Sequence, residues 1–299
     1  MKFKEKNKDI LTIGYYGQGN IGDDLMYYSS IRSKENIYSL KTKYKILSES
    51  HISNFTFIKK MFFEQTELIF SGGNIFNISS FKSYFKFLTF YIILKFRFSK
   101  KQINTFHSVG FNFTSQSKIL RYFVLCILNN ADFLHVRDLI SYRFIRRFSN
   151  VKIVFKPDSV FTNIREIKKN FSVKTTKKSN NLTVVFISSQ NLNFRTTIEI
   201  LKSENVKNTV MFFCQSKEDV IIAKKMISDN DFFLDTTICK YEYKKLNYYL
   251  NVFQNCKQII TERYHGAVLA EAFNVPWYMS GDSEKLKNIF SSKTKKNIK

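Results

Sequence analysis

One short segment of the 299-residue chain combines an anion-binding side chain with a proton-transferring one. Arg263 and His265 stand two residues apart, between an expected strand at 258–261 and an expected helix at 267–273. Arginine recognises carboxylate or phosphate through two parallel hydrogen bonds, and histidine exchanges protons near neutral pH. Gly266 beside them permits a close approach of the backbone. The segment predicts a site for an anionic substrate, with a helix-capping pair as the alternative.

A second candidate is the glycine-rich turn that follows the first expected strand. Its glycines at 17, 19 and 22 match the dinucleotide-binding spacing. However, Asp23 and Asp24 place carboxylates where a pyrophosphate would have to bind. Together with Asn20, these side chains suit the hydroxyl groups of a sugar. The alternative is that Asp23 or Asp24 only caps a helix.

Two further strand ends carry polar or glycine residues. Gly73 and Asn74 follow a strand expected at 68–70, where they form either a backbone cradle for a ligand or a plain tight turn. Arg137 follows a strand expected at 133–136, where it either binds an anion or pairs with Asp138. His107 and His135 are expected to be structural.

The elements that position these residues alternate between short apolar runs and longer mixed segments, which indicates an α/β protein with parallel strands. Strands are expected at 10–15, 44–48, 68–70, 103–108, 133–136, 151–155, 182–187, 210–213, 258–261 and 276–279. Helices are expected at 24–32, 81–95, 117–129, 139–147, 218–228, 243–255 and 267–273.

The pattern predicts two Rossmann-like domains facing a cleft. The N-terminal domain is expected at 1–166, a basic linker at 167–181, the C-terminal domain at 182–281 and a basic tail at 282–299. Open α/β sheets bind ligands at the carboxyl ends of their strands, so the candidate residues stand where a ligand is expected.

Composition limits the class of protein further. A hydrophobic content of 44% excludes a disordered chain, and the spacing of the four cysteines predicts neither a zinc site nor a disulfide framework. The net charge of +24 reflects either coding drift or a field that attracts anions. No nucleic-acid-binding motif accompanies it, so nucleic acid is not an expected partner. The basic, aromatic segment 81–101 predicts either contact with a membrane surface or a core helix with lysines at its margin.

Taken in order, several segments resemble the polysaccharide pyruvyl transferase family. They are GYYGQGNIGDDL, SGGNIF, HSVG, VRDLIS, KPDSVF and ITERYHGAVLAEAFNVPW, over roughly residues 10–160 and 255–280. Two departures from the family pattern are Asp24, where glutamate is common, and residues 107–110, where a glycine-rich strand end is usual.

The resemblance implies a fold like that of the GT-B glycosyltransferases and transfer of a pyruvyl group from phosphoenolpyruvate to a sugar of a surface polysaccharide or its lipid-linked precursor. Phosphate is released, and no cofactor or metal is implied. The implied site has His265 as general acid or base, with Asp23 and Asp24 orienting or deprotonating the acceptor. Donor-binding positions are Arg263, Arg137 and Gly266; acceptor-binding positions are Gly19, Asn20, Gly73 and Asn74.

The enzyme is expected in the cytoplasm, either free or on the inner face of the plasma membrane. The alternative function is that of a GT-B glycosyltransferase that uses a nucleotide sugar.

Overall fold

The computed structural model describes a large part of the chain, and its elements belong to two compact units. The described residues are 9–14, 16, 19–30, 37–39, 54–64, 66–72, 82–100, 102–110, 118–149, 151–174, 181–189, 194–203, 209–230 and 235–280. The first unit is drawn from residues 1–18 and 23–159, and the second unit from residues 19–22 and 160–299.

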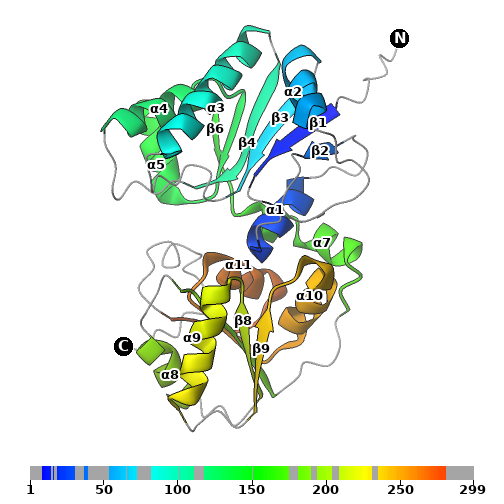
Figure 1. Ribbon diagram of the computed structural model, residues 1–299, viewed down its shortest axis with the longest axis vertical. Helices are drawn as coiled ribbons and strands as arrows, with labels where there is room; N and C mark the ends of the chain where they lie inside the picture. Colours follow the sequence, from blue (N-terminus) through cyan, green and yellow to red (C-terminus); the bar gives the residue numbers. More distant parts are fainter. Residues whose placement is uncertain are drawn as a thin grey trace. The chain divides into compact units, whose positions relative to one another are not determined.

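The first unit is built on a six-stranded parallel sheet with the order β2-β1-β3-β4-β5-β6 (Figure 1). Its strands are β1 (Asp9–Ile13), β2 (Ile37–Ser39), β3 (Thr66–Ser71), β4 (Ile103–Val109), β5 (Phe133–Val136) and β6 (Ile153–Phe155). Its helices are α1 (Ile21–Ser30), of which Ile21 and Gly22 belong to the second unit, α2 (Asn54–Phe63), α3 (Lys82–Ser99), α4 (Lys118–Leu128) and α5 (Leu139–Phe148).

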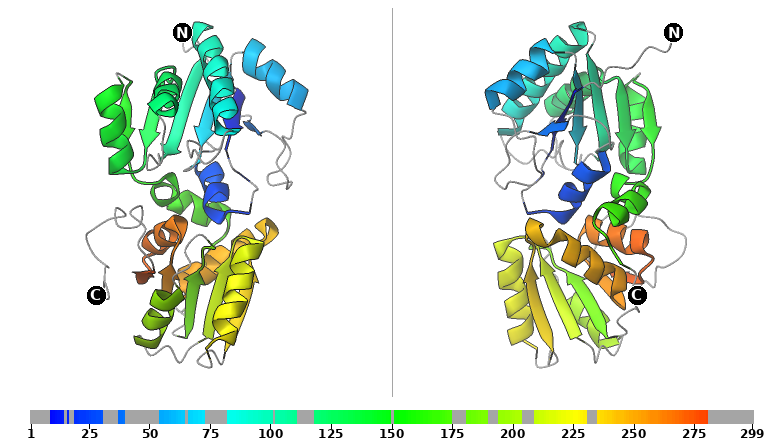
Figure 2. Two further views of the ribbon diagram at one scale, coloured as in Figure 1. Left: turned by 60° about the vertical axis from the view of Figure 1, so that its left-hand side comes forward. Right: turned by 90° about the vertical axis from the view of Figure 1, so that its right-hand side faces the viewer.

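Aromatic packing fills the core of this unit. Phe70 on β3 and Phe106 on β4 are fully buried, and their rings stack with centroids 4.8 Å apart. Helices α2, α3, α4 and α5 lie alongside the sheet (Figure 2) and share one core cluster with it. Strand β3 is buried along nearly its whole length, whereas β4 and β5 alternate between buried and partly exposed residues.

The second unit holds a five-stranded parallel sheet with the order β11-β10-β7-β8-β9. Its strands are β7 (Leu182–Phe186), β8 (Thr209–Cys214), β9 (Thr236–Lys240), β10 (Gln258–Thr261) and β11 (Trp277–Met279). Its helices are α6 (Ser159–Thr162), which starts at the last residue of the first unit, α7 (Ile164–Asn170), α8 (Phe194–Ser203), α9 (Lys217–Ser228), the 3₁₀ helix η2 (Tyr243–Lys245), α10 (Leu246–Asn255) and α11 (Tyr264–Phe273).

Three phenylalanines from different elements meet in the core of the second unit. Phe186 on β7, Phe213 on β8 and Phe253 on α10 lie with ring centroids 4.9 to 5.0 Å apart. These rings fix α10 against the sheet, so part of the chain's content of 32 phenylalanines serves packing.

The predicted fold class, two α/β domains with parallel sheets, is confirmed, and several boundaries differ. The structure adds elements that were not predicted from the sequence, namely β2, α2, α6, α7, α8 and β9. Helix α7 includes residues 167–170, at the start of the expected linker, and α11 begins at Tyr264 rather than at Ala267. The expected strand at 44–48 and the basic tail at 282–299 lie outside the described residues.

Three general features of the described residues bear on function. None of their helices is long and apolar enough to cross a membrane. They contain no group of three or more His, Cys, Asp and Glu side chains placed to hold a metal ion. All four cysteines are free.

Candidate active site

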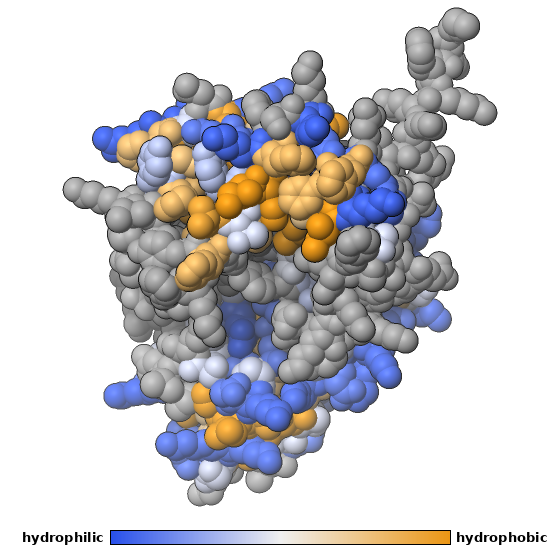
Figure 3. Space-filling model, turned by 45° about the horizontal axis from the view of Figure 1, so that its top comes forward, coloured by the Kyte–Doolittle hydropathy of each residue, from blue (hydrophilic) through white to orange (hydrophobic). Residues whose placement is uncertain are grey.

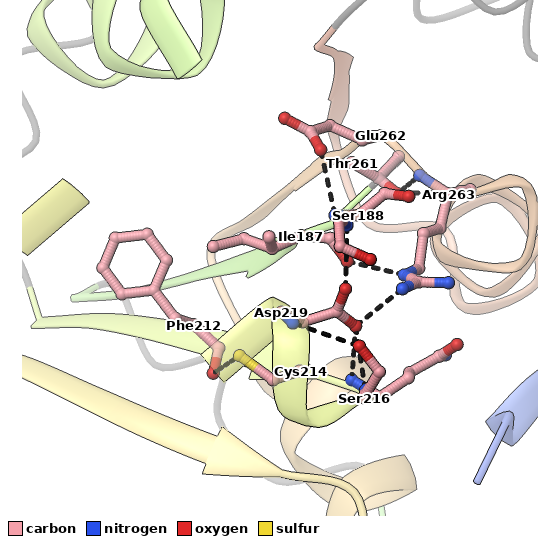
Figure 4. A network of polar contacts seen from close by, with 11 residues as sticks. Ile187, Ser188, Phe212, Cys214, Ser216, Asp219, Thr261, Glu262 and Arg263 are labelled. Atoms are coloured by element: carbon pink, nitrogen blue, oxygen red, sulfur yellow. Dashed lines mark hydrogen bonds and ion pairs between the residues drawn. The ribbon is translucent and has the colours of Figure 1, made fainter. Parts of the chain in front are cut away.

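Arg263 lies where neighbouring parallel strands of the second unit end. Its Nε donates to the carbonyl of Ile187, just after β7, at 2.5 Å, and its Nη2 donates to Asp219 Oδ2 at 2.6 Å (Figure 4). Nη1 points away from Asp219 and forms no hydrogen bond with a described residue. The side chain is 23% exposed. The guanidinium is therefore held along the edge formed by Nε and Nη2.

Asp219, near the start of α9, anchors this arginine. Its side chain is fully buried and accepts backbone N–H groups of Ser189, Gln215 and Ser216 at 2.8 to 3.0 Å. Burial raises the pKa of Asp219. Arg263 and the three N–H donors lower the pKa by a larger amount, so it lies below the ordinary value for aspartate. The carboxylate stays ionised and fixes Arg263. Asp219 was not predicted as a site residue from the sequence, although Ser216 and Asp219 have the capping-box spacing.

His265 lies in the first turn of α11 and is nearly buried, with 9% exposure. Its ring fills the space beside Gly22, where an added Cβ would lie 1.9 Å from His265 Cγ and Nδ1. Gly22 belongs to the segment 19–22 that the structure groups with the second unit. The glycine-rich turn and the Arg-x-His segment, far apart in the sequence, therefore meet at this ring.

Glu262 is a second buried acid that the sequence analysis did not select. Its carboxylate accepts the Ser188 N–H at 2.9 Å and the Thr197 hydroxyl at 3.2 Å. Burial raises the pKa of Glu262 to about 7, although these two hydrogen bonds act in the opposite direction. Glu262 is therefore partly protonated near neutral pH, next in sequence to Arg263.

In the first unit, Arg137 pairs with Asp158 and not with Asp138. Arg137 Nη1 lies 2.8 Å from Asp158 Oδ2, and both side chains are buried. Asp138 instead caps α5 by accepting the backbone N–H and the hydroxyl of Ser141, each at 2.8 Å. The alternative that Arg137 pairs with Asp138 is wrong. Asp158 lies in the KPDSVF segment, but the sequence analysis gave it no role.

Asp23 is a buried carboxyl group in the first turn of α1. Burial raises its pKa to about 7; Arg137 lowers it, while Asp24 and Asp158 raise it. The helix begins at Ile21, and Asn20 Oδ1 accepts the Gly22 N–H at 3.0 Å. Asn20 therefore performs the capping that was considered for Asp23 or Asp24.

Ser108 occupies the strand end where the family pattern usually has glycine. Its φ of 56° lies in the left-handed region that glycine adopts without strain, next to a register shift between β4 and β5. Its hydroxyl accepts the Ser159 backbone N–H at 3.0 Å, and the Ser159 hydroxyl accepts a hydrogen bond from Ser29 at 2.8 Å. Ser108 thus keeps the glycine-like backbone and adds a hydrogen bond.

The remaining predicted site residues divide into described and undescribed ones. Gly19 has a φ of 86°, and an added Cβ would lie 3.3 Å from the Gln215 carbonyl oxygen. Gly266 has no room for a side chain, because a Cβ would lie 2.2 Å from Thr261 Oγ1. Gly73 and Asn74 lie outside the described residues. The donor and acceptor roles assigned to these residues stay predictions.

Solved structures with a similar fold include UDP-GlcNAc 2-epimerases. The enzyme from Methanocaldococcus jannaschii is 12% identical with a TM-score of 0.54, covering 94% of this chain and 86% of the other. The enzyme from Neisseria meningitidis, bound to UDP-GlcNAc, is 8% identical with a TM-score of 0.55, covering 94% and 85%. S. aureus MnaA with UDP is 11% identical with a TM-score of 0.54, covering 93% and 80%. The GT-B-like architecture is thereby confirmed.

Sequence comparison identifies the family. No curated protein matches the chain. The family model for polysaccharide pyruvyl transferase matches residues 20–282, which include the turn at Asn20 and the segment from Arg263 to His265. Because this match covers most of the chain, the protein belongs to the polysaccharide pyruvyl transferase family and is a transferase.

Proposed function

We propose that the protein transfers the pyruvyl group of phosphoenolpyruvate to a sugar in a surface polysaccharide or its lipid-linked precursor. The family supports pyruvyl transfer in general. One observation supports phosphoenolpyruvate as the donor. Ile187 and Asp219 hold Nε and Nη2 of Arg263, and Nη1 takes part in neither of these hydrogen bonds. Phosphoenolpyruvate carries a carboxylate and a phosphate, and each is a good partner for a guanidinium group.

The ion pair with Asp219 gives Arg263 a fixed position before substrate arrives. A side chain that is already ordered loses little entropy on binding, so more of its interaction energy appears as affinity. In this proposal Arg263 binds the carboxylate or phosphate of the donor. Arg137, which pairs with Asp158, and Gly266, which packs against Thr261, are the other proposed donor-binding positions.

His265 is the proposed acid–base residue. In the reaction a sugar hydroxyl oxygen forms a bond to C2 of phosphoenolpyruvate, C3 takes up a proton, and the C2–O bond to phosphate breaks. A second hydroxyl attacking C2 completes the ketal. The two hydroxyl groups lose two protons, of which one balances the gain at C3 and the other leaves with phosphate. His265 transfers one of these protons.

Asp23 is the proposed partner of the acceptor hydroxyl. With a pKa of about 7, its carboxyl group exists in both protonation states near neutral pH and can accept a hydroxyl proton. Asp24, Gly19, Asn20, Gly73 and Asn74 are the other proposed acceptor residues. No cofactor or metal enters the proposed reaction.

Phosphate release from phosphoenolpyruvate in the presence of lipid-linked oligosaccharide tests this function, with mass spectrometry for the added pyruvyl group. Arg263→Ala and His265→Ala should each lower the rate by at least about 100-fold while the melting temperature shows a folded protein. Arg263→Lys, which keeps the charge but loses the planar fork, should also be impaired. Arg195→Ala, at a side chain 88% exposed on α8, is the matched control. Full activity of Arg263→Ala or His265→Ala contradicts the proposed roles.

The rival donor is a nucleotide sugar, because two of the similar structures hold UDP or UDP-GlcNAc. A ligand that binds the native state raises the melting temperature. Phosphoenolpyruvate should raise it in the wild type and not in Arg263→Ala, whereas UDP-GlcNAc should leave it unchanged. Stabilisation by UDP-GlcNAc alone would overturn the proposal in favour of glycosyl transfer.

A further inference from the structure

Helix α3 exposes an apolar face. Phe85, Leu88, Ile92 and Phe96 are 63%, 42%, 57% and 38% exposed. Their spacing of three or four residues places them on one side of the helix. The opposite side is already buried in the core through Phe87 and Leu94. A surface helix normally presents polar residues to water, so this second apolar face is not explained by the core.

The same surface continues onto α2. Ile58 and Phe63 are 47% and 77% exposed, and the rings of Phe62 and Phe96 meet edge to face with centroids 5.2 Å apart. Hydrophobic side chains of the first unit form a band in the upper half of the face shown in Figure 3. The α2–α3 surface is defined by Ile58, Phe63, Phe85, Leu88, Ile92 and Phe96. Large contiguous apolar patches of this kind mark interaction sites.

Basic side chains predominate around this surface. Helices α2, α3 and α4 contain no aspartate or glutamate. Their basic residues are Lys59, Lys60, Lys82, Lys86, Lys95, Arg97, Lys118 and Arg121. Lys60 pairs with Glu64 and Arg97 is buried, whereas Lys59, Lys95 and the following Lys100 are exposed. The matching partner is both apolar and negatively charged.

A bilayer that contains anionic lipid fits this description. Aromatic and aliphatic side chains enter the boundary between headgroups and acyl chains, and lysines at the margin meet lipid phosphates. A second copy of the chain would bring like charges together, since each copy carries +24. Nucleic acid would satisfy the lysines but leave the apolar side chains in contact with water.

We propose that the α2–α3 surface docks the protein on an anionic membrane, with α3 lying along the membrane surface. Phe85, Leu88, Ile92 and Phe96 enter the interface, and Lys59, Lys95 and Lys100 bind the headgroups. None of these residues takes part in the proposed reaction. The docking is therefore tested without reference to pyruvyl transfer.

Vesicle flotation with the full chain tests the docking. The wild type should float with vesicles of phosphatidylcholine mixed with phosphatidylglycerol, and much less with phosphatidylcholine alone. The double variant Leu88→Gln/Ile92→Gln should bind the mixed vesicles at least about tenfold more weakly, because the transfer of two apolar side chains is lost. The matched control is Ile221→Gln/Tyr248→Gln, at side chains 66% and 52% exposed in the second unit, which should bind as the wild type does.

Three outcomes would overturn the docking: no binding of the wild type, equal binding to neutral vesicles, or unchanged binding of Leu88→Gln/Ile92→Gln. Analytical ultracentrifugation addresses the rival occupant. A dimer that the double variant loses, without vesicle binding by the wild type, identifies a second copy as the partner. Phosphate release with a water-soluble acceptor should be unchanged in Leu88→Gln/Ile92→Gln, which keeps a failure of docking distinct from a failure of the proposed reaction.

Discussion

Gly22 has no side chain to compete with the ring of His265, which occupies the adjacent space. Gly22→Ala should displace that ring. We expect a loss of about 1–3 kcal/mol in the free energy of unfolding from overpacking, and a larger proportional loss of phosphate release. Urea denaturation and the activity assay measure the two effects separately.

The double variant Gly22→Ala/His265→Ala isolates the cause of this loss. Once the ring is removed, the methyl group at position 22 has room, so adding Gly22→Ala to His265→Ala should cost little further stability. If Gly22→Ala lowers the free energy of unfolding as much in the His265→Ala background as in the wild type, its effect does not arise from a clash with the His265 ring.

Asp23 should make stability depend on pH. Its pKa is about 7 in the native state and ordinarily 3.8, so between these values the native protein holds a proton that the unfolded chain has lost. The contribution is fully present below about 3.8 and is lost as the pH rises through about 7. Asp23→Asn removes it. The melting temperature of the variant relative to the wild type should therefore rise between about pH 5 and about pH 8.

Glu262 also has a pKa of about 7, so the wild type alone cannot isolate the contribution of Asp23. Glu262 contributes equally to the pH dependence of Asp23→Asn and of the wild type, so its contribution cancels when the two are compared. The control is Asp229→Asn, which changes an exposed carboxylate at the end of α9. A difference between Asp23→Asn and the wild type that does not vary with pH would show that Asp23 has an ordinary pKa.

Helix α3 is attached to its neighbours by one buried arginine. Arg97 donates to Asn104 Oδ1 and the Thr66 carbonyl, each at 2.8 Å, and also to the carbonyl of Met61 on α2. Burial lowers the pKa of Arg97 to about 10, so it remains charged at neutral pH. All of these acceptors are uncharged, and they tie α2, α3, β3 and β4 together.

Arg97→Met should lower the free energy of unfolding by about 3–5 kcal/mol, because buried carbonyl groups lose their donors. Arg97→Lys should recover less than half of this, since an ammonium group cannot reach acceptors on three sides. Urea denaturation measures both. Arg146→Met, at an exposed arginine on α5, should change stability by less than about 0.5 kcal/mol.

Most elements were predictable from the sequence because they contain a continuous apolar run or begin with recognisable helix-capping residues. Strand β10 and helix α9 illustrate the two cases. Helix α8 was missed because it contains Thr196, Thr197 and Ile198 in succession, and β-branched residues favour strands. Strand β9 was missed because it lies at the sheet edge, where its side chains need not be apolar.

The charged residues of the site were predictable from the sequence, but the acidic residues that pair with its arginines were not. Arg263 and His265 stand out by type and spacing next to Gly266. The pairing of Arg263 with Asp219 and of Arg137 with Asp158 joins residues 44 and 21 positions apart. Such contacts depend on which strands are neighbours in the sheet, and the local sequence does not contain that order.

At the scale of the whole molecule, a functional charge of +24 should accelerate the association of the anionic donor with the protein. A positive field speeds the encounter with an anion and is screened by salt. Raising potassium chloride should then lower kcat/KM for phosphoenolpyruvate several-fold while leaving kcat unchanged. The control is a sucrose series, which does not screen charge. A flat kcat/KM in salt would assign the charge to coding drift.

Residues 19–22 belong to the second unit, whereas residues 23–159 of the first unit separate them from the rest of it. During synthesis this segment emerges long before its packing partner His265, so the second unit completes its contacts only after residue 265 has emerged. The same fact sets a rule for chimaeras between family members. An exchange of the second unit must therefore include residues 19–22. A single junction at 159/160 would combine His265 of one family member with the 19–22 turn of another.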